Sequence, residues 1–146
     1  MSKEFIDGDQ VKKELIEYWI DLIDEDLGCF TDKASVLQLI YQLRDADMLN
    51  VVSIKNTGIF AFSYVPDFRG GKCLAELVFY IRKENRGDVR LVKKYLQRVE
   101  EMADRKHCNS VRIGGNIGYK DDSFLRLLNR WGYKADTVVK YLTKTV

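Results

Sequence analysis

The sequence predicts a mixed α/β domain in which helices cover a central sheet. Apolar residues recur at helical spacing in the first third of the chain, and strand-like runs joined by short turns fill the middle. Strand-like and helix-like segments then alternate, which is typical of a sheet packed between helices. Because 146 residues suffice for one hydrophobic core, we expect a single domain over residues 1–146.

Two amphipathic helices are expected at the start of the chain. The first runs from about Asp9 to Leu27 and ends at Gly28. Thr31 or Asp32 caps the second helix, which ends near Asp45. The apolar face expected for this second helix consists of Val36, Leu37, Leu39, Ile40 and Leu43.

The middle of the chain predicts an antiparallel meander, because short turns join its strand-like runs. The runs are Met48–Lys55, Ile59–Val65 and Cys73–Arg82, with Asn56–Gly58 as the first turn. The third run is apolar on both faces, which places it in the middle of a covered sheet. Whether Glu4–Ile6 adds a short strand before the first helix stays open.

A long helix is expected after this meander, with Asp88 at its start and its end near Lys106. Three elements follow it: a strand at Ser110–Ile113, a helix at Asp122–Arg130 ended by Gly132, and a strand at Thr137–Thr143. The strand–helix–strand unit from Cys73 to Ile113 should form a parallel pair. The predicted order is therefore α-α-β-β-β-α-β-α-β.

The composition argues against several classes of protein. A net charge of +2 does not by itself indicate a nucleic-acid partner, and no apolar run is long enough to span a bilayer. His107 and three cysteines are too few for a zinc site, so we expect no metal. The cysteines are expected to be small buried hydrophobes in a reducing, cytoplasmic setting; they are Cys29, Cys73 and Cys108.

The segment with the most chemical content joins the third strand to the long helix. Its loop is basic and contains Gly87, and unpaired backbone N–H groups at a helix start attract anions. Arg86 and Arg90 could add charge-assisted hydrogen bonds to a phosphate. From this segment alone, an ordinary loop with solvated arginines is the simpler interpretation.

This junction and the order of elements resemble the GNAT superfamily of acyl-CoA-dependent N-acetyltransferases, from Asp9 to the C-terminus. In that family a central strand leads into an Arg/Gln-x-x-Gly-x-Gly/Ala loop whose amides hold the coenzyme A pyrophosphate. The central strand and the next parallel strand splay apart, and the pantetheine arm lies between them. The segment Phe124–Tyr133 resembles the family's last helix and its ending. The residues that the resemblance assigns to acetyl-CoA binding are Phe79, Tyr80, Ile81, Arg86, Gly87, Asp88, Val89, Arg90 and Leu91.

The sequence departs from the family pattern at four positions, one of which is Asp121, where the family has a familiar asparagine near the start of the last helix. Val89 and Leu91 occupy the two glycine positions of the loop, and Leu128 occupies the position where the family often has a proton-donating tyrosine. The resemblance implies an N-acetyltransferase that moves an acetyl group from acetyl-CoA to a primary amine by direct attack. The alternative is a binding or regulatory protein that keeps the fold without the reaction.

Acetyl transfer to an amine needs a base for the proton of the ammonium. On the central strand Glu76 is the predicted base, although a carboxylate that faces solvent or pairs with a lysine is the simpler interpretation. Tyr119 and Tyr80 are the predicted acids, each of which could instead be a packed aromatic side chain.

The acceptor amine could belong to a small molecule or to a protein. The first helix–helix connection carries acidic residues that could attract it, or that simply form a solvated loop: Asp24, Glu25, Asp26 and Asp32. A homodimer stays open. Nucleic acid is a weaker hypothesis, since the basic residues of the long helix fit its solvated face: Lys93, Lys94, Arg98 and Arg105.

Overall fold

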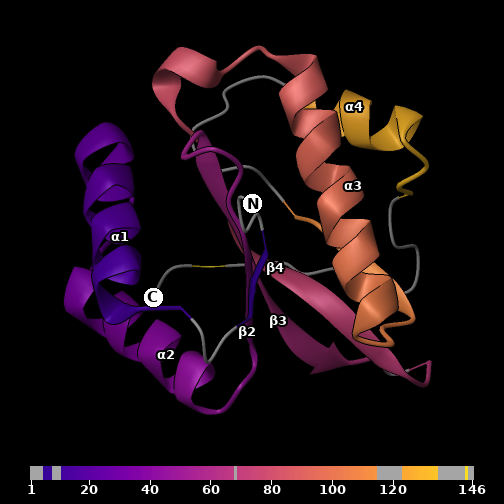
Figure 1. Cartoon of the computed structure of the whole chain (residues 1–146), viewed down its shortest axis with the longest axis horizontal. Coiled ribbons are helices and arrows are strands. Elements are labelled where there is room, and N and C mark those ends of the chain that lie inside the picture. The colour runs from indigo at the N-terminus through magenta and orange to yellow at the C-terminus, as the bar shows by residue number, and fades with distance from the viewer. Residues whose placement is uncertain (1–4, 8–10, 68, 115–122, 135–143, 145–146) are drawn as a thin grey trace.

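A five-stranded sheet with the order β1-β2-β3-β4-β5 lies between two layers of helices (Figure 1). This computed structural model describes residues 5–7, 11–67, 69–114, 123–134 and 144. The strands are β1 (Phe5–Asp7), β2 (Leu49–Val52), β3 (Gly58–Pro66), β4 (Lys72–Ile81) and β5 (Ser110–Arg112). The helices are α1 (Lys13–Leu27), α2 (Lys33–Asp45), α3 (Val89–Arg105) and α4 (Ser123–Arg130). The predicted mixed α/β class is confirmed.

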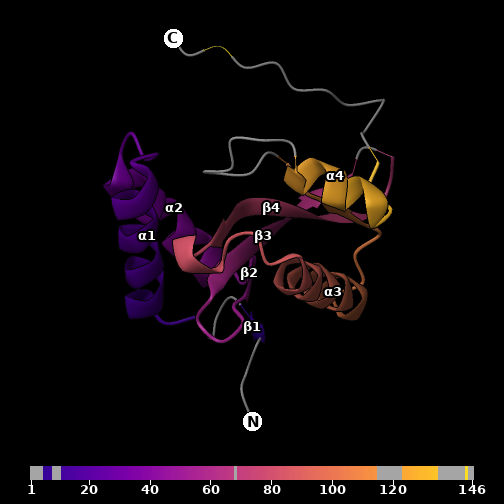
Figure 2. The same ribbon diagram turned by 90° about the horizontal axis from the view of Figure 1, so that it is seen from above.

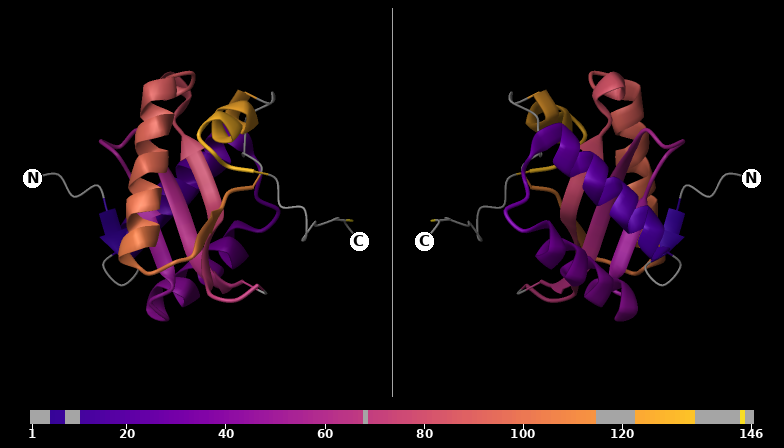
Figure 3. Two further views of the ribbon diagram at one scale, coloured as in Figure 1. Left: turned by 90° about the vertical axis from the view of Figure 1, so that its right-hand side faces the viewer. Right: turned by 90° about the vertical axis from the view of Figure 1, so that its left-hand side faces the viewer.

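The helices divide between the two faces of the sheet. The two side views in Figure 3 show α3 across one face and α1 with α2 across the other, and α4 packs on the face of α3. Among the described residues, no helix has the combination of length and apolar character that crossing a bilayer requires. The predicted strand at Thr137–Thr143 lies outside the described residues.

The predicted end of α1 and start of α2 agree with the local chemistry, whereas α1 begins at Lys13 and not near Asp9, because Lys12 is still extended. Gly28 ends α1 with a φ of 56°, and its amide donates to the carbonyl of Asp24 at 2.8 Å. Asp32, rather than Thr31, caps α2, since its carboxylate accepts from the amide of Ser35 at 3.2 Å. The predicted apolar face of α2 is confirmed for four residues, which pack against the cluster between α1 and the sheet: Val36, Leu37, Ile40 and Leu43. The expected inward position of Leu39 is wrong, because it lies at the edge of this face and is 52% exposed.

The meander is antiparallel as predicted, and β4 pairs with β5 in parallel. The open question about the N-terminus is answered by β1, which pairs antiparallel with β2. In contrast to the prediction, β2 stops at Val52. The amide of Ile54 donates to the hydroxyl of Tyr95 at 3.1 Å instead of to β3, and Lys55 and Asn56, with φ values of 47° and 58°, then form the turn into β3.

A β-bulge interrupts the pairing of β3 with β4. Ala61 pairs with Val78 and Phe62 pairs with Glu76, so Leu77 is an extra residue on β4 and is 40% exposed. The bulge reverses the alternation of side chains along β4. As a result Glu76 lies on the same face of the sheet as Phe79, toward α3 and α4.

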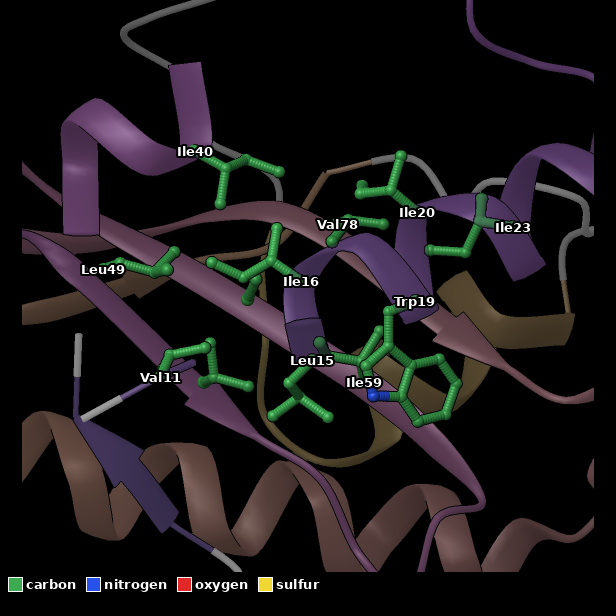
Figure 4. A pocket seen from close by; sticks show the side chains of 12 residues that line it. Val11, Leu15, Ile16, Trp19, Ile20, Ile23, Ile40, Leu49, Ile59 and Val78 are labelled. Atoms are coloured by element: carbon green, nitrogen blue, oxygen red, sulfur yellow. The ribbon is translucent and has the colours of Figure 1, made fainter. Parts of the chain in front are cut away.

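Two apolar clusters fill the spaces on either side of the sheet. On the α3 and α4 face, Phe79 stacks on Phe60 with ring centres 4.1 Å apart and contacts Phe124 at 5.1 Å. On the α1 and α2 face the packing leaves a void of about 30 Å³ (Figure 4). Apolar side chains alone line this void, among them Trp19 and Val51, so it offers too few polar partners to hold a water.

The cysteines do not all follow the prediction. Cys73 is buried and Cys108 is half-buried, but Cys29 is exposed because it follows Gly28 in the surface connection between α1 and α2. His107 is exposed just after the end of α3. In the described part of the chain, no group of three or more metal-ligating side chains converges.

Candidate functional site

The start of α3 is built as the sequence predicts. A short 3₁₀ turn η2 (Lys83–Asn85) follows β4, and Gly87 then adopts a φ of 90° that side chains rarely permit. Asp88 caps the helix, because its carboxylate accepts from the amide of Leu91 at 3.2 Å. This arrangement fixes the direction in which the first amides of α3 point.

Four backbone amides at this junction are available to a ligand. Among the described residues, the N–H groups of Gly87, Asp88, Val89 and Arg90 donate no hydrogen bond. They lie at the positive end of the dipole of a 17-residue helix. Such amides bind anions such as phosphate groups, although the carboxylate of Asp88 contributes one negative charge of its own.

A hollow of about 280 Å³ opens beside these amides, between α3 and α4. Figure 2 shows α3 and α4 side by side on the same side of the sheet. Gly87, Asp88, Val89 and Val92 line one wall of the hollow, and Phe124, Arg126, Leu127 and Arg130 line the other. Val89 is 52% exposed, and Leu91 packs against the core instead, so neither side chain fills the hollow.

The parallel strands β4 and β5 separate close to this site. Their pairing spans three positions, from Cys73 with Ser110 to Ala75 with Arg112. Beyond these positions β4 continues to Ile81, and no described strand pairs with it on that side. Within the described part of the chain, the backbone of β4 past Ala75 therefore has no strand partner on the side of β5.

Glu76 lies at the point where the strands separate. Its Oε2 accepts from the amide of Gly114 at 3.1 Å, and its Oε1 is buried without a partner among the described residues. Burial raises the pKa of this carboxyl to about 7, and the hydrogen bond from Gly114 offsets only part of the rise. The simpler interpretation is wrong, because Glu76 neither faces solvent nor pairs with a described lysine.

Sequence comparison finds no match to a family model or to a curated protein. Solved structures match the fold at low identity. A predicted acetyltransferase with acetyl-CoA from Clostridium acetobutylicum has a TM-score of 0.70 and 11% identity, with 95% of this chain and 94% of that chain covered. A GNAT family acetyltransferase from Staphylococcus aureus has a TM-score of 0.63 and 20% identity, with 92% of this chain and 91% of that chain covered.

This chain has the GNAT fold. A transcriptional regulator from Bacillus halodurans C-125 also matches, with a TM-score of 0.71, 13% identity, and 97% of this chain and 98% of that chain covered. The predicted GNAT resemblance is thus confirmed at the level of the fold. At these identities the comparisons carry no conclusion about the reaction.

Within the GNAT fold, the arginine that the resemblance assigns to the loop is engaged elsewhere. The Nε of Arg86 donates to the carbonyl of Ile81 at 3.0 Å, and its guanidinium forms an ion pair with Asp26 of α1. The Tyr80 hydroxyl donates to the same carboxylate at 2.7 Å. Arg86 is therefore tied to the end of α1 and does not line the hollow.

These contacts change the protonation of both partners. The hydrogen bond from Tyr80, and then the guanidinium of Arg86, hold the pKa of Asp26 below its ordinary value despite partial burial. Burial, and then the nearby carboxylate of Asp26, raise the pKa of Tyr80 to about 12. Tyr80 therefore keeps its proton at neutral pH, and Asp26 is a structural partner rather than part of an open acidic surface.

Arg126 and Arg130 line the hollow, and sequence reasoning missed both of them. Both are exposed on α4 and line the hollow, and neither pairs with a described carboxylate. Their i,i+4 spacing predicts a shared helix face, but only the packing of α4 beside α3 places that face at the hollow.

Some of the remaining predicted site residues lie in the core, one is exposed, and one is outside the described residues. Phe79 and Ile81 place their side chains in the core, so only their backbone could meet a ligand. Leu128 is also in the core, 4% exposed, and has no group that could transfer a proton. Arg90 is exposed in the first turn of α3. Tyr119, the predicted acid, lies outside the described residues.

Proposed function

We propose that this protein binds acetyl-CoA and transfers its acetyl group to a primary amine. The observation that carries the proposal is the set of amides at residues 87–90 that have no partner among the described residues, beside the hollow that Gly87, Asp88 and Val89 help to line. A diphosphate seated there would satisfy donors that otherwise have no partner in the described chain. The solved acetyltransferase with acetyl-CoA that shares the fold supports this choice of ligand.

The separation of β4 from β5 supports binding of the pantetheine arm of the same ligand. An extended pantetheine arm carries amide groups, and it can form hydrogen bonds with strand backbone that lacks a neighbouring strand. The open backbone of β4 starts at Glu76 and runs toward the start of α3. A ligand along it would place its thioester near Glu76 and its diphosphate near Gly87.

In the proposed reaction a neutral amine attacks the thioester carbonyl carbon. A C–N bond forms and the C–S bond breaks, the amine proton passes to the carboxylate of Glu76, and the leaving thiolate takes a proton from solvent. Since burial raises the pKa of Glu76 to about 7, much of it is deprotonated at neutral pH and it is well matched to act as a base. Positioning of the two reactants supplies much of the remaining acceleration.

The proposal does not depend on a tyrosine at position 128. A thiolate is a tolerable leaving group, so water can protonate it. Tyr119 stays the predicted acid, whereas the hydroxyl of Tyr80 already donates to Asp26. The acceptor is proposed to be a primary amine of a small molecule or of a protein.

A thermal shift measurement followed by a turnover assay tests this proposal. Acetyl-CoA at about 100 times its Kd should stabilise the fold by about 2.7 kcal/mol. Release of free thiol should then follow the addition of a suitable primary amine. Glu76→Gln should keep the thermal shift and lower the rate of thiol release. No shift at millimolar acetyl-CoA would contradict the proposal.

A GNAT-fold binding protein without turnover is the second candidate. The buried leucine at position 128 favours it, since the family's usual proton donor is replaced by a core side chain. The regulator that shares the fold is consistent with such a role. This candidate predicts a thermal shift with acetyl-CoA but no thiol release with any of the primary amines that are assayed.

A further inference from the structure

We propose that Arg126 and Arg130 bind the 3′-phosphate of coenzyme A and make the protein selective for the 3′-phosphorylated form. This inference rests on the proposed function, because it assumes that coenzyme A occupies the hollow. The inference assigns a role to the wall of the hollow that α4 forms. The loop motif at the start of α3 and the proposed base Glu76 leave this wall without a role.

The two walls of the hollow differ in chemistry. The α3 wall offers neutral amides together with the carboxylate of Asp88, whereas the α4 wall offers the guanidinium groups of Arg126 and Arg130. These arginines are one helical turn apart and exposed, and no described carboxylate pairs with either. Like charges at i,i+4 weaken an isolated helix, so an anion between them would remove an unfavourable interaction.

The 3′-phosphate fits this pair better than the diphosphate does. It is a monoester that carries nearly two negative charges at neutral pH, whereas each group of the diphosphate carries about one. The carboxylate of Asp88 disfavours a dianion at the α3 wall and favours it across the hollow. Guanidinium groups bind phosphate oxygens through paired N–H donors, which suits a terminal phosphate with three free oxygens.

The tied position of Arg86 supports the same assignment. Its Nε donates to the carbonyl of Ile81, its guanidinium pairs with Asp26, and it does not line the hollow. Among the described residues, the guanidinium groups that line the hollow come from α4 alone.

The test compares the affinities of coenzyme A and 3′-dephospho-coenzyme A by isothermal titration. The wild type should bind coenzyme A at least about tenfold more tightly, since hydrogen bonds between charged groups have that effect. Arg126→Gln and Arg130→Gln should each lower this ratio severalfold while affinity for the dephosphorylated ligand stays nearly constant. Lys134→Gln is the matched control, because Lys134 is exposed near the end of α4 and does not line the hollow, so its ratio should equal that of the wild type.

Several outcomes would overturn the inference. Equal affinity of the wild type for both ligands would refute it and leave the proposed function intact. An equal loss of affinity for both ligands in the arginine variants would assign these side chains to the diphosphate instead. If neither ligand binds, the proposed function fails together with this inference. Melting temperatures without ligand identify any variant that has lost its fold.

Discussion

Glu76 should make the stability of the protein depend on pH in a way that Glu76→Gln removes. The glutamine keeps the length of the side chain, and its Oε1 can accept the hydrogen bond from Gly114. The substitution therefore changes the charge and little else. Any difference in stability between the two proteins that varies with pH reports the ionisation of this carboxyl.

The size and sign of the effect follow from the pKa. Burial raises it from 4.5 to about 7, which at about 1.4 kcal/mol per pH unit corresponds to about 3 kcal/mol. Below pH 4.5 the carboxyl is protonated in both the folded and the unfolded chain. Between pH 4.5 and 7 only the unfolded chain releases the proton, so rising pH favours unfolding. Above pH 7 the carboxyl is ionised in both states, and the full loss of folding stability is present.

Urea denaturation at several pH values between 4.5 and 8 measures this effect. The free energy of unfolding of Glu76→Gln minus that of the wild type should increase by about 3 kcal/mol across the range. Other titrating groups are common to both proteins and cancel. A difference that stays constant with pH would refute the buried, poorly solvated position of Glu76, and with it the argument that this carboxyl has a pKa suited to a base.

Two further predictions concern the packing. Asp26→Asn should lower the free energy of unfolding by about 1.5 to 3 kcal/mol, because a half-buried carboxylate then no longer pairs with its hydroxyl and guanidinium donors. The exposed neighbour change Glu25→Gln should alter it by less than about 0.5 kcal/mol, and similar losses in both variants would contradict the ion pair. Val51→Ile should fill part of the void of about 30 Å³ and stabilise the fold by up to about 0.7 kcal/mol, measured by urea denaturation. The control is Val52→Ile on the other face of the sheet, where the described side chains leave no such void, and this change should destabilise the fold. If both variants or neither variant stabilised the fold, the void beside Val51 would be refuted.

The local signals in the sequence predicted the elements well. Gly28, Asp32 and Asp88 each end or start a helix through a short-range hydrogen bond or backbone angle that depends on few neighbours. The antiparallel order of β2, β3 and β4 followed from turn lengths, and the parallel pairing of β4 with β5 followed from the helix between them. These features are decided within a few residues, so the sequence displays them directly.

Features that depend on residues far apart in the chain could not be predicted from the sequence. The bulge at Leu77 was hidden because β4 is apolar on both faces and its alternation does not reveal the register. The ion pair of Arg86 with Asp26 joins residues 60 positions apart. Arg126 and Arg130 line the hollow only because α4 packs beside α3.

A change at Val89 tests the anion site most directly. Val89 is the first residue of α3, is 52% exposed and lines the hollow. An aspartate there should leave the fold intact, since an acidic residue in the first turn stabilises a helix by about 0.3–1 kcal/mol. At about 5 Å from a phosphate and an effective dielectric constant of about 20, its charge should weaken binding by about 3 kcal/mol, or about 100-fold.

Isothermal titration of acetyl-CoA into Val89→Asp and Val89→Asn therefore separates charge from shape. We expect the asparagine variant to bind within a few fold of the wild type and the aspartate variant to bind about 100-fold more weakly. Equal affinities in these variants would show that no diphosphate sits at the start of α3, and the absence of binding to the wild type would remove the coenzyme site altogether.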